Sequence, residues 1–200
     1  VYLIYFQKGA VFMLREGKST AGDFRIPSGC AVSSVFSRSG KRLDGSDIIR
    51  SIEIMHDRSN GLGGGFAGYG IYPEYAEQYA FHVFYNTIKA KEECEKFINE
   101  HFDVVNLSKI PIRKIPQITD EPLIWRYFVT PLHTKLAESQ LDEDEFTACC
   151  VNRVNTFIDG AYIFSSGKNM GVFKAVGYPE DVGRFYRLDE YAGYCWTAHG

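Results

Sequence analysis

The chain has 200 residues, of which 45% are hydrophobic and 15% aromatic. This composition can bury the core of one ordinary domain and excludes a disordered chain. The formal net charge of −3 argues against a nucleic-acid groove or a surface for anionic membranes, and no apolar run approaches the roughly 18 residues of a membrane span. Five cysteines without a C-x-x-C pair favour a reduced, cytoplasmic protein. The five histidines are single and scattered, which predicts no metal site.

Residues 1–29 are interpreted as a leader that resembles a propeptide. Two short apolar runs, 1–6 and 11–14, are broken by polar residues and a glycine. A secretory signal would need a basic start and one unbroken apolar core. The chain starts without Met, and residues 194–200 read as the middle of a strand. We therefore expect it to be trimmed or incomplete.

A short strand and a helix are predicted after the leader. The β-rich run 32–37 predicts a strand that Cys30 opens. Ser46 is expected to cap the helix that follows, with Asp47 in its first turn. Apolar residues then recur at helical spacing, and Asn60-Gly61 predicts the end of this helix.

The run 63–72 has glycine at five of its first eight positions and is predicted to be a strand. Glycine weakens a strand, so such a strand indicates the close approach of another backbone or of a ligand. Gly63, Gly65 and Gly68 also satisfy G-x-G-x-x-G. The dinucleotide fingerprint requires a strand before the glycines and a helix after them. Here the predicted order is reversed, which argues against nucleotide binding.

The segment from Tyr79 to about Val176 is predicted to contain a β-α-β-β-(α or β)-β succession. It begins with a strand (79–85) and a helix capped by Thr87, whose apolar stripe comprises Ile88, Cys94, Phe97, Ile98 and Phe102. Extended stretches (104–105 and 110–115) and a strand or short helix (122–129) follow. An acidic surface excursion (136–145) then leads to a segment of ambiguous periodicity (146–158). This order predicts a ferredoxin-like insertion at about 79–160.

The last part of the chain is predicted to hold a hairpin, a short helix and a final strand. Residues 161–164 and 170–176 are expected to pair across a turn containing Lys168-Asn169. Pro179 is expected to open the helix, because proline is tolerated in the first turn. Residues 191–198 predict the last strand.

Cys30 has two interpretations. A lone cysteine is most often a buried, inert thiol. The alternative is a nucleophile, which inside a chain needs a neighbouring base such as His. A cysteine at a chain start carries its own base, because the free α-amine has a pKa near about 8. That interpretation requires the removal of residues 1–29, and Ser28-Gly29 is a small, flexible junction for it.

Other polar residues have simpler explanations. Arg58 and Asn60 could orient a ligand, but both residue types are common at a helix C-terminus for local reasons. Lys168-Asn169 is explained by a turn. His199 is either close to a catalytic site or simply at the end of a strand.

Five blocks of the sequence together resemble the class II glutamine amidotransferase part of glutamate synthase, most closely the stand-alone amidotransferase subunit of archaeal-type enzymes. They read PSGC (27–30), DII (47–49), RSNGLGGGFAGYGIYPEY (58–75), FSSGKNMGVFK (164–174) and WTAHG (196–200). The resemblance runs from about Ile26 to the last residue.

The resemblance implies an α+β fold, an αββα sandwich of the N-terminal-nucleophile hydrolase type, present in part. Residues 30–200 would be the N-terminal part of the amidotransferase domain. Cys30 matches the family's nucleophile, which attacks the side-chain amide of glutamine, forms a glutamyl thioester and frees ammonia. The ammonia would pass to a flavin-containing glutamate synthase domain or subunit, which adds it to 2-oxoglutarate. FMN and iron–sulfur centres are expected on that partner, and no cofactor in this chain.

The sequence departs from the family at three points. Ala31 stands where the family usually has Gly, and Cys30 is internal. The expected substrate-binding arginine, Asn-Gly oxyanion pair and Asp would lie beyond Gly200. We therefore expect the chain alone to be inactive, because loss of an oxyanion donor costs roughly 10²-fold or more in rate. A non-catalytic regulatory or binding subunit, and an amidohydrolase acting on another amide, stay open.

Overall fold

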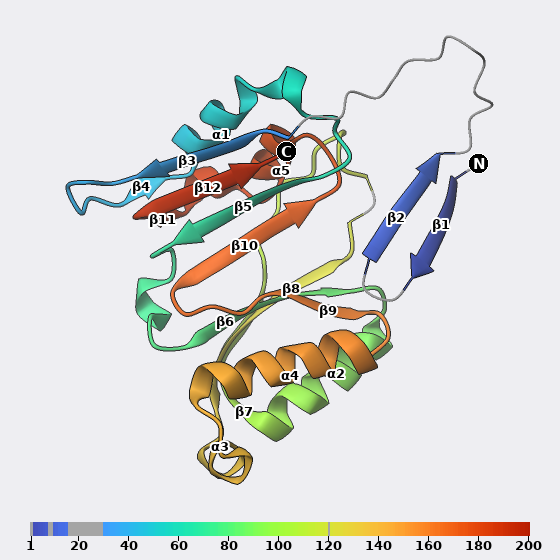
Figure 1. Ribbon diagram of the computed structural model, residues 1–200, viewed down its shortest axis with the longest axis vertical. Helices are drawn as coiled ribbons and strands as arrows, with labels where there is room; N and C mark the ends of the chain where they lie inside the picture. The colour runs from blue at the N-terminus through green and yellow to red at the C-terminus, as the bar shows by residue number, and fades with distance from the viewer. Residues whose placement is uncertain (1, 8–9, 16–29, 120) are drawn as a thin grey trace.

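A computed structural model of the protein describes residues 2–7, 10–15, 30–119 and 121–200. The fold is α+β and is built on two four-stranded antiparallel sheets (Figure 1). The two apolar runs near the start of the given sequence correspond to β1 (Tyr2–Gln7) and β2 (Ala10–Arg15), which pair with each other as an antiparallel hairpin. The Ser28-Gly29 junction lies outside the described residues.

The first sheet, called sheet I, has the strand order β10-β5-β12-β3. Its strands are β10 (Met170–Ala175), β5 (Gly64–Tyr69), β12 (Cys195–His199) and β3 (Val32–Phe36). Helices α1 (Ser46–Glu53) and α5 (Pro179–Phe185) pack on one face. Apolar side chains of helix and sheet, including Ile49, Phe66 and Trp196, share one core there. The predicted strand at 32–37, the glycine-rich strand and the helix opened by Pro179 are confirmed.

The other face of sheet I is open. Along β3, residues alternate between the two faces, and those that point away from the helices are exposed. Val32 is 69% exposed and Phe36 65% exposed, and Tyr69 of β5 is also exposed. Sheet I is therefore an antiparallel sheet with one buried face and one accessible face.

The second sheet, called sheet II, has the strand order β7-β8-β6-β9. Its strands are β7 (Phe102–Lys109), β8 (Leu123–Pro131), β6 (Tyr79–Tyr85) and β9 (Ala161–Ser165). Helices α2 (Ile88–His101) and α4 (Glu143–Phe157) cover one face, and α3 (His133–Ser139) precedes α4. The opposite face, with Ala80 and Phe128, joins the core of sheet I. The chain therefore runs β-α-β-β-α-β through this sheet, as predicted, and the ambiguous segment 146–158 is helical through Phe157.

Two short strands and three 3-10 helices complete the described structure. Strands β4 (Leu43–Asp44) and β11 (Ala192–Gly193) pair with each other. The 3-10 helices are η1 (His56–Arg58), η2 (Pro73–Tyr75) and η3 (Leu188–Glu190).

The predicted hairpin at 161–176 is wrong. Strand β9 pairs with β6 in sheet II, and β10 pairs with β5 in sheet I. The segment between them crosses from one sheet to the other and is held there by a hydrogen bond from the Ala80 amide to the Gly167 carbonyl (3.0 Å). Each strand thus completes the edge of a larger sheet, which buries more apolar surface than an isolated pair can.

The predicted N-cap at Ser46 is also wrong. Gly45 occupies the cap position without a side-chain bond, and Ser46 is the first helical residue. The Ser46 amide donates instead to the Asp44 carboxylate at 2.8 Å, which lowers the pKa of Asp44. The helix ends at Glu53, before the predicted Asn60-Gly61 stop, and η1 follows it.

Helix α2 confirms its predicted cap and corrects its predicted stripe. Thr87 accepts a hydrogen bond from the Ala90 amide at 3.1 Å. Cys94 and Ile98 are buried, but Ile88 is exposed, and Phe102 belongs to β7 and not to the helix. Residues 136–145, expected to be an excursion, belong largely to α3 and the start of α4.

Candidate functional site

Cys30 lies at one end of sheet I, immediately before β3. It is exposed, and its thiol is free. The next residue, Ala31, exchanges two backbone hydrogen bonds of 3.0 Å with Gly200. The Ala31 side chain is 2% exposed and packs into the core. These contacts hold the backbone beside Cys30 against the end of β12. Burial at Cys30, the inert alternative, is therefore not observed.

The same end of sheet I carries polar side chains on its open face. Lys174 of β10 lies opposite Gly65 of β5, and Gly65 lies opposite His199 of β12. His199 in turn lies opposite Val32 of β3. This row of four, called the Lys174–Val32 row, crosses the whole sheet, and Cys30 precedes its last member, Val32, by two residues. Because residues in register share a face, Lys174 and His199 flank the side-chain-free position at Gly65.

A cavity of about 280 Å³ lies over this row. Lys174, Gly65 and His199 line one part of it. The next row along the sheet, Val172, Ala67 and Thr197, lines another. Phe164 of β9 adds an aromatic wall from sheet II. Apolar walls with a few convergent polar groups are typical of small-molecule sites.

The glycine-rich strand makes this arrangement possible. A Cβ on Gly65 would lie 2.5 Å from His199 Nε2, so the imidazole ring occupies the space above Gly65. A Cβ on Gly64 would lie 2.7 Å from the Cα of Pro179, at the start of α5. The predicted close approach of another backbone is thus confirmed at Gly64. The G-x-G-x-x-G pattern runs into β5 and then η2, without an α-helix directly after it.

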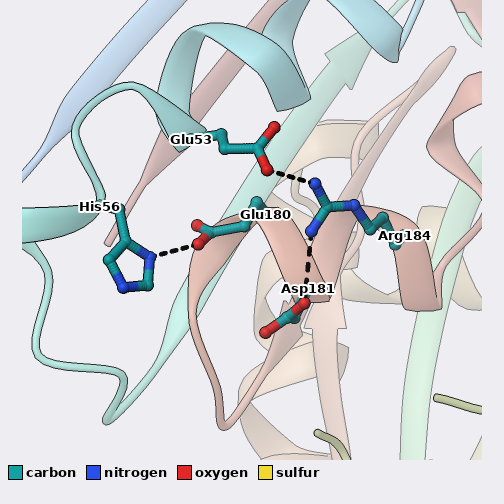
Figure 2. A network of polar contacts seen from close by, with 5 residues as sticks. All are labelled: Glu53, His56, Glu180, Asp181 and Arg184. Carbon is teal, nitrogen blue, oxygen red and sulfur yellow. Dashed lines mark hydrogen bonds and ion pairs between the residues drawn. The ribbon is translucent and has the colours of Figure 1, made fainter. Parts of the chain in front are cut away.

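A polar network lies behind this end of the sheet and links α1 to α5 (Figure 2). Arg184 of α5 pairs with Glu53 of α1 at 2.5 Å and with Asp181 at 3.4 Å. His56 contacts Glu180 through Nδ1 at 2.5 Å. The Glu180 side chain is almost completely buried, and its other oxygen has no hydrogen-bond partner. The network fixes Pro179 and Glu180, and with them the helix against which Gly64 packs.

The other residues named from the sequence have local roles. Asn60 accepts a hydrogen bond from the Leu62 amide (3.0 Å), and Arg58 is exposed in η1. Lys168 pairs with Glu143 at 2.8 Å. Asn169 has φ 49° and accepts a hydrogen bond from the Tyr72 amide (2.9 Å) at the opposite end of sheet I. The structure therefore brings Cys30 and His199 to one end and leaves Lys168 and Asn169 at the other.

Sequence reasoning missed Lys174, Thr197 and Phe164. Thr197 and His199 are two apart on one strand, a spacing that puts them on one face. That signal was available for β12. Lys174 and Phe164 carry no such signal, because their position depends on which distant strands pair.

His82 is a buried titratable residue away from this cavity, between the two sheets. Its Nδ1 donates to the Val172 carbonyl at 2.7 Å, and its Nε2 accepts from the Tyr72 hydroxyl at 2.9 Å. Burial lowers the pKa of His82 to about 3, and the nearby Arg126 guanidinium also lowers it. A neutral imidazole with both nitrogens bonded is a structural link between the sheets.

The described part of the chain comprises residues 2–7, 10–15, 30–119 and 121–200. Within these ranges, no three side chains of His, Cys, Asp or Glu gather as a metal site would require. Their helices include none with the length and apolarity of a membrane span.

The comparisons with known proteins relate the chain to a curated archaeal protein. No protein-family model matches it. Over 173 residues, or 85% of its length, it is 46% identical to a protein of Archaeoglobus fulgidus described as an uncharacterized protein. The aligned part is 46% of that protein, so the chain spans about half the length of the curated relative that it matches. The sequence shared with this archaeal protein includes most of the described structure.

Proposed function

We propose that the protein is a class II glutamine amidotransferase component that hydrolyses glutamine to glutamate and supplies ammonia for glutamate synthesis from 2-oxoglutarate. Cys30 is its nucleophile. The observation that carries this proposal is the position of Cys30: an exposed thiol at the end of sheet I, two residues before Val32, whose row holds His199 and three residues that line a cavity. The inert, buried thiol that is the usual alternative does not fit that position.

The fold supports the same proposal. Helices α1 and α5 with sheet I make one helix layer and one strand layer, and the strand layer keeps an open face with exposed Val32 and Phe36. An αββα N-terminal-nucleophile sandwich contains two such adjacent layers, and in it a second sheet would cover that face. Sheet II stands between β5 and β10 in the chain and serves as the ferredoxin-like insertion.

The departure at Ala31 is compatible with this site. The Ala31 methyl group packs in the core while its backbone pairs with Gly200. A glycine at this position would lack the methyl group, and the open face of sheet I does not depend on that methyl group. Replacement of glycine by alanine therefore leaves the exposed side of Cys30 unchanged.

The proposed reaction needs a free amino group on Cys30. Removal of residues 1–29 would expose this α-amine, which takes the thiol proton. The thiolate then attacks the side-chain amide carbon of glutamine. The carbon–nitrogen bond breaks, ammonia leaves with the proton returned by the amine, and a glutamyl thioester remains. Water attacks the thioester, releases glutamate and restores the thiol. Ammonia is used by the flavin-containing synthase partner, which carries the FMN and iron–sulfur centres.

Mass spectrometry of the mature, complete protein tests the requirement for a free amine. We expect a polypeptide that begins at Cys30. A mature chain in which Gly29 is still joined to Cys30 would contradict the proposal.

Ammonia release from glutamine by the complete protein tests the nucleophile. We expect Cys30→Ala to reduce it by about 10³-fold or more, because the covalent step is lost. Cys149→Ala is the matched control, since Cys149 is also exposed but lies on α4 of sheet II. It should keep the parent rate. Equal rates for Cys30→Ala and the parent would leave the non-catalytic binding or regulatory subunit as the better interpretation.

A further inference from the structure

Pro179, the first residue of α5, packs against two glycines at the Cys30 end of sheet I. A Cβ on Gly64 would lie 2.7 Å from the Cα of Pro179, and a Cβ on Gly200 would lie 2.7 Å from its Cγ. The proline therefore occupies the side-chain space of both glycines. Since glycine permits such close approach, the start of β5 and the backbone just after β12 both rest on α5.

The contact at Gly200 continues to Cys30 through the backbone. Gly200 and Ala31 exchange two hydrogen bonds of 3.0 Å, and the Ala31 methyl group is buried in the core. Ser59 also lies against this end of the sheet, because its Oγ would lie 2.9 Å from a Cβ on Gly200. Cys30 directly precedes Ala31, so the position of α5 sets the position of the Cys30 backbone.

His56 holds the residues on both sides of Pro179. Its Nδ1 lies 2.5 Å from a carboxylate oxygen of Glu180, and its ring stacks on Tyr178 with the ring centroids 4.0 Å apart. Figure 2 shows His56 beside Glu180 at the start of α5. Both a neutral ring with a proton on Nδ1 and an imidazolium can donate this hydrogen bond. The link therefore does not require a charged His56.

Glu180 depends on this link more than an exposed acid would. Its side chain is almost completely buried, and within the described residues His56 is the one side chain to which it is hydrogen-bonded. Its second carboxylate oxygen is buried without a hydrogen bond. A buried carboxylate that loses its partner is strongly destabilising. The pair therefore holds the first turn of α5 in one position.

A second link joins α5 to α1, further along α5 from Pro179. Arg184 and Glu53 lie 2.5 Å apart, and both side chains are partly exposed. Exposed ion pairs contribute little to stability. The two links thus differ, because His56 flanks the residue that packs on the glycines and Glu53 does not.

We propose that His56 and Glu180 are positioning residues for the Cys30 nucleophile. They act through Pro179 and the backbone next to Cys30, and not by contact with the substrate. The effect on turnover rests on the proposed function. The placement of the Cys30 backbone rests on the contacts alone.

The test measures ammonia release from glutamine and hydrogen exchange in the complete protein. We expect His56→Ala to lower kcat about 10- to 100-fold and to change KM less than about twofold, because a small displacement of a reacting group slows the chemical step. The peptide with the Ala31 amide should exchange about tenfold faster or more. The peptide with the Asn86 amide, which donates to the Gly160 carbonyl beside sheet II, should not change.

Three further variants separate positioning from a general loss of stability. His56→Asn keeps a donor at the place of Nδ1 and should restore most of kcat. Glu53→Gln removes the other link between α1 and α5 and should behave like the parent. Glu180→Gln leaves no buried charge unpaired and repeats the measurement in case His56→Ala does not fold. It should also lower kcat, because the charge-assisted hydrogen bond is lost.

Three outcomes would overturn the inference: an unchanged kcat or an unchanged exchange rate at Ala31 in His56→Ala, equal acceleration of both peptides, or an equal effect of Glu53→Gln. The proposed function fails separately. If the parent releases no ammonia from glutamine, that function falls, and exchange at Ala31 still decides whether His56 positions Cys30.

Discussion

The two four-stranded sheets differ in how their faces are covered. Sheet II is buried on both sides, by α2 and α4 on one face and by the shared core on the other. Sheet I is buried only on the side of α1 and α5. The polar groups differ accordingly. In sheet II, His82 is fully buried with both ring nitrogens hydrogen-bonded. In sheet I, His199 and Lys174 are exposed at a cavity.

This difference separates polar residues that stabilise the fold from polar residues that are accessible to a ligand. A buried polar group has to be satisfied by the protein itself, which leaves it nothing for a ligand. On the open face of sheet I, side chains can exchange water for a ligand at little cost. The candidate chemistry therefore belongs to sheet I, and sheet II is a scaffold attached to it.

The largest expected effect compares one phenylalanine from each sheet in the 200-residue chain. Phe81 of β6 is 1% exposed and packs edge-to-face on Phe102, whereas Phe36 of β3 is 65% exposed. Phe81→Ala should lower the free energy of unfolding by about 3–5 kcal/mol, because it leaves a cavity. Phe36→Ala should change it by less than about 0.5 kcal/mol. Urea unfolding followed by fluorescence measures both. Similar losses would mean that the face of sheet I at Phe36 is covered.

The second prediction compares adjacent glycines on the two faces of β5. Gly64→Ala should cost about 1–3 kcal/mol of unfolding free energy, because the new methyl group meets the backbone of Pro179. Gly65→Ala should cost less, since it meets only the ring of His199, which can rotate. It should nevertheless weaken glutamine binding, because the methyl group enters the cavity.

Thermal unfolding and glutamine titration of these two variants separate stability from binding. The expected pattern is opposite for the two positions, with stability lost at Gly64 and binding lost at Gly65. If Gly65→Ala binds glutamine like the parent, the cavity over the Lys174–Val32 row is not the ligand site.

The third prediction concerns pH and the buried face of sheet II. The pKa of His82 falls from an ordinary 6.5 to about 3 in the folded protein because of burial. The unfolded chain therefore takes up a proton more readily. This contribution to stability is complete above pH 6.5 and is lost as the pH falls towards 3. The slope should reach about 1.4 kcal/mol per pH unit.

Urea unfolding at several pH values below neutrality measures this slope. His82→Gln should flatten it, because glutamine does not titrate. His133→Gln, on exposed α3, should leave it unchanged. A parent slope that survives in His82→Gln would assign the pH dependence to other groups.

Local sequence patterns predicted many elements because their causes are local. Thr87 predicted the start of α2, since its hydroxyl satisfies an amide three residues away. The position of Pro179 predicted α5, a β-rich run predicted β3, and an apolar, aromatic run predicted β6. The errors also have local causes. At Ser46, the side chain of Asp44 already serves the helix start, so the favourable residue type was not the cap.

The candidate site was only partly predictable. Cys30 could be named from its place before β3 and from the resemblance to a family. Lys174 could not, because its position beside Gly65 and His199 depends on strands that are far apart in the chain. The expected hairpin even placed β10 beside β9, in a different sheet.

By itself, the sequence determined several of the elements, among them β3, β5, α2 and α5, where glycine permits close approach, and that Cys30 precedes a strand. The tertiary structure alone decided which strands pair, which face of sheet I stays open and that Lys174, Gly65 and His199 share a row. The reason is physical. Helix caps and strand periodicity depend on neighbours within a few residues, whereas strand pairing depends on hydrogen bonds and burial between distant segments.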